Sequence, residues 1–90
     1  MNWHDISSYS KGQETREIQT VELEIRRDFS IIVSRHIRYP GKWLASTRDK
    51  YFLPQTELLS NSLEDAKREA LLLVFNRLDD FHKAVGRLIQ

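Results

Sequence analysis

Few side chains in this 90-residue chain have a spacing that supports chemistry. Asp79 and His82 stand three residues apart, about one turn of a helix, and could supply two ligands to a metal ion. A structural zinc site needs four ligands, and the chain has no cysteine to help complete the set. We therefore expect these two side chains to form an ion pair or a hydrogen bond, and we predict no metal site.

The other candidate motifs do not predict catalysis either. Gly41-Lys42 lacks the earlier glycine and the following serine or threonine of a phosphate-binding loop. Asp79 and Asp80 are neighbours on a polar helix side, so they do not face each other across a cleft as paired catalytic carboxylates do. No serine stands in a nucleophile-elbow context. We predict no catalytic residue, no cofactor and a non-enzymatic protein.

A basic segment in the middle of the chain is the strongest electrostatic feature. Residues 26–50 carry seven basic and two acidic side chains, a net charge of +5 in a chain whose total is +1. Trp43 and two other aromatic or imidazole side chains are interleaved with them, a combination that suits phosphate contacts and base stacking. The alternative function is therefore nucleic-acid binding by the sheet segment 26–50. Its candidate residues are Arg26, Arg38, Lys42 and Arg48.

The order of elements predicts an α+β fold. Alternating apolar and polar residues indicate strands over 18–26 and 29–39, then over 42–47 and 51–53, the last stopped or confined to an edge by Pro54. Ser62 is a good N-cap for a long amphipathic helix from Leu63 to about Val85, which Gly86 could end. We expect an antiparallel three- to four-stranded β-meander followed by this C-terminal helix, packed across one face.

Strand parity predicts which side chains form the core. One face of the first two strands and one face of the helix should meet, with small alanines allowing the helix to approach the sheet. Ile32 should point to the opposite face. The expected core consists of Val21, Leu23, Ile25, Phe29, Ile31 and Val33 on the sheet, and Ala66, Ala70, Leu73, Val74 and Phe81 on the helix.

The helix has more apolar surface than the sheet can cover. At 1.5 Å per residue it spans roughly 35 Å, whereas strands of six or seven residues span roughly 20–23 Å. Leu72 and Phe75 also lie outside the main apolar stripe. One interpretation is that the N-terminal segment fills the gap, with Trp3 or Tyr9 on Phe75 or Phe81. The preferred one is a homodimer or protein-partner interface that uses Leu72, Phe75 and the last turns of the helix, including His82.

The rest of the chain is ordinary for a small soluble domain. Residues 1–13 are polar and are expected to be flexible or loosely docked, and residues 14–90 form a single α+β domain. The longest apolar run is five residues, from Leu71 to Phe75, far short of a membrane span. The start has neither a basic nor an apolar signal-peptide region. We expect a cytoplasmic protein with no membrane partner.

Two short resemblances accompany this pattern. The segment Ser62-Leu63-Glu64-Asp65-Ala66-Lys67-Arg68-Glu69-Ala70-Leu71, placed after a sheet, resembles the helix start of HicB-type antitoxins. The β-β-β-α order with Ala66-Lys67 is similar to the C-terminal half of double-stranded-RNA-binding domains. That family places a lysine pair where this chain has Glu64-Asp65, so the phosphate-clamping residues are missing. Both resemblances concern the fold and transfer no function.

Overall fold

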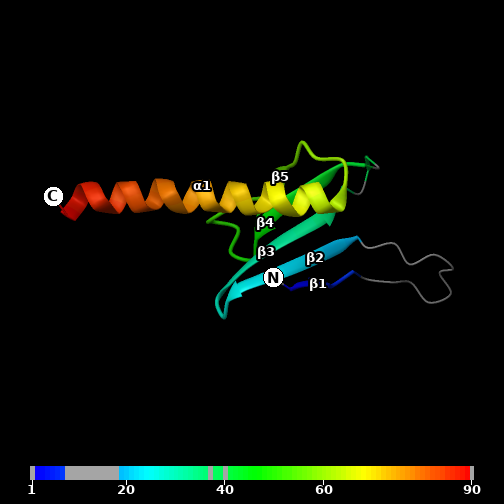
Figure 1. The fold of residues 1–90 in the computed structure, drawn as a ribbon, viewed down its shortest axis with the longest axis horizontal. Coiled ribbons are helices and arrows are strands. Elements are labelled where there is room, and N and C mark those ends of the chain that lie inside the picture. The colour runs from blue at the N-terminus through cyan, green and yellow to red at the C-terminus, as the bar shows by residue number, and fades with distance from the viewer. Residues whose placement is uncertain (1, 8–18, 37, 40, 90) are drawn as a thin grey trace, which may run out of the picture.

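The structure, a computed structural model, describes residues 2–7, 19–36, 38–39 and 41–89. Five strands and one helix follow one another along these residues (Figure 1). Their bounds are β1 Trp3–Asp5, β2 Thr20–Arg26, β3 Phe29–Arg35, β4 Trp43–Thr47, β5 Thr56–Glu57 and α1 Leu63–Ile89.

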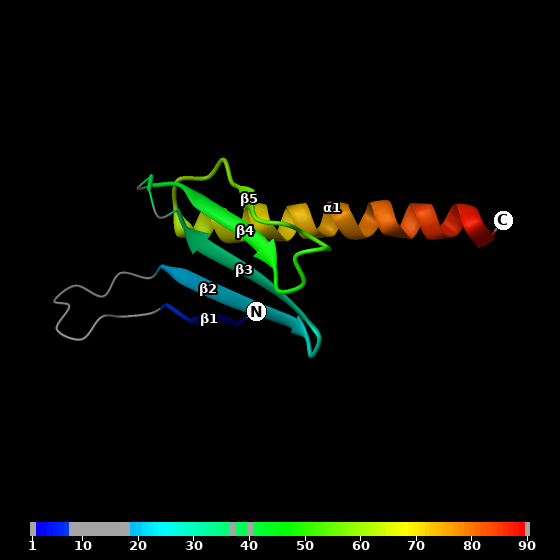
Figure 2. The same cartoon turned by 180° about the vertical axis from the view of Figure 1, so that it is seen from behind.

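All five strands form one antiparallel sheet in sequence order, β1-β2-β3-β4-β5. The helix lies on one face of this sheet and packs on β3 and β4, whereas β2 and β1 lie to its side (Figures 1 and 2). The predicted α+β fold, a meander followed by one long helix, is confirmed, with two additional short edge strands. In the central register Val21 is opposite Val33, and Leu23 is opposite Ile31.

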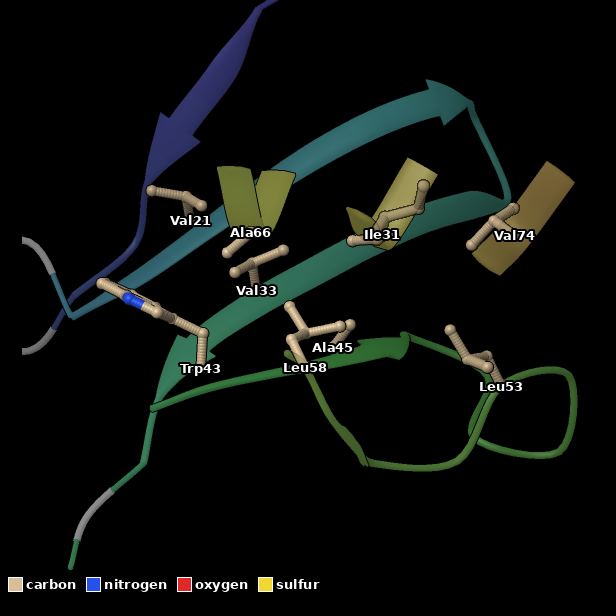
Figure 3. Packing of buried hydrophobic residues seen from close by; sticks show 10 residues of the cluster. Val21, Ile31, Val33, Trp43, Ala45, Leu53, Leu58, Ala66 and Val74 are labelled. Atoms are coloured by element: carbon tan, nitrogen blue, oxygen red, sulfur yellow. The ribbon is translucent and has the colours of Figure 1, made fainter. Parts of the chain in front are cut away.

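The core lies between the helix and the face of the sheet that carries these residues (Figure 3). Ile31 and Val33 are fully buried, and two alanines of the helix, Ala66 and Ala70, lie in the same cluster without any exposed surface. Small side chains at Ala66 and Ala70 let the helix backbone come close to the sheet, as predicted. The buried apolar cluster is Val21, Ile31, Val33, Trp43, Ala45, Leu53, Leu58, Ala66, Ala70 and Val74.

The helix is anchored at its N-terminal end by polar contacts. The amide of Asp65 donates to the hydroxyl oxygen of Ser62 at 3.3 Å, which confirms Ser62 as the N-cap. The Glu69 carboxylate accepts hydrogen bonds from the amides of Leu59 and Ser60, each at 2.9 Å, and from the Ser60 hydroxyl at 2.7 Å. Burial raises the pKa of Glu69, but these hydrogen bonds outweigh burial and hold its pKa below the ordinary value.

Four predicted core residues are less buried than expected, and one of them, Phe29, is half-buried and packs edge-on against Phe52. Ile25 is 47% exposed because the pairing of β2 with β3 shifts between Glu24 and Arg26, and this bulge leaves Ile25 without a partner across the ladder. Leu73 is half-buried at the side of the helix. Phe81 is exposed because the helix has passed the end of the sheet by that point.

Two strand predictions were wrong. The expected fourth strand, residues 51–53, is part of a turn. The Asp49 carboxylate accepts from the amide of Tyr51 at 3.0 Å, and the Thr47 hydroxyl accepts from the amide of Leu53 at 3.1 Å. These local bonds fold the segment back, and the edge strand forms after Pro54. The strand expected to reach Tyr39 ends at Arg35, where the chain turns and the amide of Lys42 donates to the Tyr39 carbonyl.

The helix also continues beyond the predicted end. Gly86 lies inside α1, which runs to Ile89. Gly41 is the glycine with a positive φ, at 84°, so Gly86 keeps helical geometry and does not form a left-handed C-cap.

The first strand adds Trp3 to the helix-facing side of the sheet. Trp3 is opposite Leu23, and the ammonium group of Lys67 lies 5.8 Å from its ring centre. Trp3 is therefore near the first turns of α1, so the expected packing of Trp3 on Phe75 or Phe81 was wrong. Tyr9 and the predicted boundary at residue 13 lie outside the described residues.

Candidate interaction surface

The last contacts between α1 and the rest of the described chain are aromatic. The ring of Phe52 packs edge-on against Phe29, with centroids 5.0 Å apart, and against Phe81 at 5.2 Å. The Arg77 side chain donates from Nε to the Phe52 carbonyl at 3.1 Å, and its guanidinium group lies 5.1 Å from the Phe81 ring centre. These residues fix the turn after β4 to the middle of the helix.

Past its contact with Phe52, the helix extends away from the sheet (Figures 1 and 2). We call residues 78–89 the overhang; this segment begins one turn before that last contact, which Phe81 makes. It carries large apolar side chains that the described residues leave open to solvent: Leu88 is 85% exposed and Ile89 is 80% exposed. A surface helix normally has an apolar stripe that packs on the core and a polar side that faces solvent. An apolar stripe that continues where no sheet lies beneath it therefore needs an explanation.

Five apolar residues of α1, together with His82, follow a regular spacing. Alternating steps of four and three residues connect positions on one side of the helix, and this is the spacing by which two helices pack along a common seam. Leu71 follows the sheet-facing Ala70 by one residue, so the seam lies about 100° around the axis from the sheet. We call this set the helix seam: Leu71, Phe75, Leu78, His82, Val85 and Ile89.

The predicted interface is only partly the same surface. Phe75 and His82 belong to the helix seam and are exposed, Phe75 by 67%. Leu72 is exposed too, but it lies at the edge of the seam. Sequence reasoning pointed to the last turns of the helix but did not single out Leu78, Val85 or Ile89. Counting the four-three spacing, in addition to the main sheet-facing stripe, would have found them.

Two shallow hollows meet along this side of the molecule. One, of about 370 Å³, runs along the helix and is lined by Leu71, Leu72, Phe75 and Leu78, with Arg68 at its rim and Val74 at its base. The other, of about 550 Å³, lies between α1 and the hairpin of β2 and β3. Leu78, Ile25, Phe29 and Phe52 line its apolar part, and Arg26, Asp28 and Asp49 line its polar part. Leu78 lines both, so the apolar parts of the two hollows adjoin each other.

The four candidate nucleic-acid contacts are not gathered into one patch. Arg26 and Arg48 lie toward the hairpin end of the sheet, whereas Arg38 and Lys42 belong to the turn at the other end. Three of them have acidic partners: Arg26 with Asp28 at 2.9 Å, Lys42 with Glu57 at 3.8 Å, and Arg48 with Glu22. Because these basic side chains are paired with acidic ones and lie at two ends of the sheet, they present less positive charge to a phosphate backbone than the sequence suggests.

No group of three or more metal-ligating side chains comes together in the described part of the chain. Asp79 instead pairs with Lys83 at 3.0 Å, and this hydrogen bond and charge raise the pKa of Lys83. Nor is any helix among the described residues long and apolar enough to cross a membrane.

Comparison with known proteins adds no family to this picture. Neither protein-family models, nor curated proteins, nor solved structures give a match to the chain. The surface formed by the helix seam and the overhang therefore has to be interpreted from its own physics.

Proposed function

We propose that this chain is a small non-enzymatic interaction protein that self-associates as a homodimer through its C-terminal helix. The observation that carries the proposal is the apolar overhang. Its large apolar side chains, and that of Phe75 just before it, are exposed in the single chain. They nevertheless continue the apolar stripe of the helix. Covering such a patch is favourable by roughly 25 cal/mol per Å² of apolar surface removed from water.

The helix seam favours another helix as the covering element. Helices that pack along a shared seam insert side chains from alternating steps of three and four residues into gaps of the facing helix. The seam of this chain continues through six such positions from Leu71 to Ile89, so a second copy offers a surface with a matching repeat.

A charge placed in the seam tests this proposal. Phe75→Glu puts a carboxylate on a residue that is 67% exposed in the single chain, so the monomer should fold normally while the dimer is lost. Leu59→Glu is the matched control, because Leu59 is 89% exposed in the loop before α1 and is outside the seam. Sedimentation at about 100 μM should show a dimer for wild type and Leu59→Glu and a monomer for Phe75→Glu. Equal masses for the two variants would contradict the proposal.

The alternative, nucleic-acid binding by the sheet, keeps a direct test. Neutralising Arg26, Arg38 and Lys42 together should weaken binding to RNA or DNA, and the affinity should fall steeply with salt. Because two of these three side chains already have acidic partners, we expect little binding even at about 50 mM salt. Tight, salt-sensitive binding that the triple variant abolishes would favour the alternative.

A further inference from the structure

The apolar surface of the overhang is wider than a pair of helices can cover. Val85 and Ile89 belong to the helix seam, but Phe81, Ala84 and Leu88 point toward the side on which the sheet packs farther back along the same helix. Only the side with Asn76, Asp79, Asp80, Lys83 and Arg87 is polar. A covering partner must therefore supply a helix against the seam and a second surface, at right angles to it, against Phe81 and Leu88.

This molecule contains such a two-walled surface. The helix packs on β3 and β4 and does not lie over β2 and β1, which continue the sheet to one side of it (Figures 1 and 2). Ile25 of β2 remains 47% exposed there, whereas Val21 and Leu23 of the same strand are buried. One wall is therefore the helix seam, and the other is the hairpin end of the sheet, where Ile25, Phe29 and Phe52 line a hollow with Leu78. We call the hollow between these two walls the clasp groove.

A second helix can pack beside α1 on this side. Packed helix axes lie about 8–10 Å apart, which is about two spacings between neighbouring strands. Because α1 packs on β3 and β4, a helix displaced by that much toward the seam reaches the hairpin end of β2.

We propose that the overhang of a second copy occupies the clasp groove, antiparallel to α1, and that the exchange is reciprocal. This inference rests on the proposed self-association and names its geometry. An antiparallel pairing centred near Asp80 places every seam residue opposite another: Leu71 faces Ile89, Phe75 faces Val85, and Leu78 faces His82. The largest side chain thereby meets a smaller one.

The same alignment also covers the remaining apolar side chains. Phe81 of one copy comes level with Asp79 of the other, next to Leu78 and the hollow that Ile25 lines, and Leu88 comes level with Leu72. A parallel pairing would bring the two copies' sheets side by side and would leave both overhangs without a sheet to cover them.

Engineered cysteines test the direction of the helices, because the chain has no cysteine of its own. Leu71 and Ile89 are separated by about 27 Å along the helix, so a disulfide between copies reports which residues face each other. The double variant Leu71→Cys/Ile89→Cys should become a covalent dimer on oxidation, and each single variant should stay uncross-linked. Cross-linking of the single variants would show a parallel pair and overturn the inference. So would a double variant that is dimeric but does not cross-link.

Ile25→Glu tests the sheet wall of the clasp groove. Ile6→Glu is its control, because Ile6 is 44% exposed and lies on the opposite side of the sheet, near Thr20 and Leu44. Ile25→Glu should raise the dimer dissociation constant by about tenfold or more, and Ile6→Glu should change it by less than about twofold. Equal effects would remove the sheet from the interface.

The outcomes separate this inference from the proposal beneath it. A wild-type protein that stays monomeric removes both. If Phe75→Glu disrupts the dimer and Ile25→Glu does not weaken it, self-association stands and only the proposed occupation of the clasp groove is overturned. If Ile25→Glu does not fold, the cysteine pair alone decides the helix direction and with it the inference.

Discussion

Glu69 is the residue whose ionisation contributes most visibly to the fold. Its carboxylate holds the loop before α1 through the amides of Leu59 and Ser60 and the Ser60 hydroxyl, and its pKa is lowered in the folded state. A lowered folded pKa means that the stabilisation is complete above the unfolded value of about 4.5 and is lost as pH falls through the folded value.

We predict that Glu69→Gln is less stable than wild type at pH 7 and that the difference in unfolding free energy shrinks as pH falls below about 4.5. Urea unfolding from pH 7 to pH 3 measures this difference. Glu64→Gln is the control, because the Glu64 side chain is 83% exposed and bonds only to Lys67 among the described residues. If the difference in unfolding free energy between wild type and Glu69→Gln stays constant with pH, the Glu69 carboxylate is not what holds the loop.

Adjacent isoleucines of β3 test the assigned faces of the sheet. Ile31 is fully buried against α1, and Ile32 points to the opposite face and is half-buried. Ile31→Ala should cost roughly 2–5 kcal/mol of unfolding free energy, and Ile32→Ala should cost less than about 1.5 kcal/mol. Leu73→Ala should cost less than Ile31→Ala, because Leu73 is half-buried. Chemical denaturation decides, and a larger loss at Ile32 than at Ile31 would contradict the register.

The turn between β4 and β5 shows where an element escapes a prediction from sequence. Apolar Tyr51-Phe52-Leu53 before a proline looks like a strand, but the deciding interactions are single hydrogen bonds from the amides of Tyr51 and Leu53 to the side chains of Asp49 and Thr47. Such bonds compete with strand pairing and have no periodic signature. Periodicity did locate β2 to β4, the helix and its N-cap, because their apolar faces repeat over many residues.

We predict that Thr47→Val destabilises this turn. Thr47 is completely buried, and its hydroxyl oxygen accepts from the amide of Leu53 at 3.1 Å. Valine keeps the shape but leaves that amide without its acceptor, which should cost about 1–3 kcal/mol. Ser46→Ala, on the open face of the same strand, should cost less. Thermal unfolding of both variants is the measurement, and equal melting temperatures would show that the hydroxyl contributes little.

The helix illustrates a second limit of sequence reasoning. Its excess length over the sheet could be calculated, and the structure confirms that it extends past the sheet. The residues of its outer surface were found only in part, since Phe75 and His82 were recognised and Leu78 and Val85 were not. Two overlapping apolar patterns, one facing the sheet and one forming the helix seam, share the same 27 residues, and a single-stripe analysis separates them poorly.

At the scale of the whole molecule, charge placement and apolar surface favour different partners. Composition alone made residues 26–50 look like a phosphate-binding segment. The fold divides their basic side chains between two ends of the sheet and gives three of them acidic neighbours. Asp28 is two residues from Arg26, but Glu22 is 26 residues from Arg48, so no local pattern could have predicted that pairing. The large apolar side chains of the overhang, by contrast, are left exposed to solvent by the described residues.

The mass of the wild-type protein in solution tests the central claim most directly. Sedimentation equilibrium at about 100 μM, well above the dissociation constant of a specific dimer, needs no variant and no partner. The overhang and the helix seam predict a species of twice the 10.7 kDa chain mass, which separates into monomers on dilution. A single species of 10.7 kDa at that concentration would contradict the account.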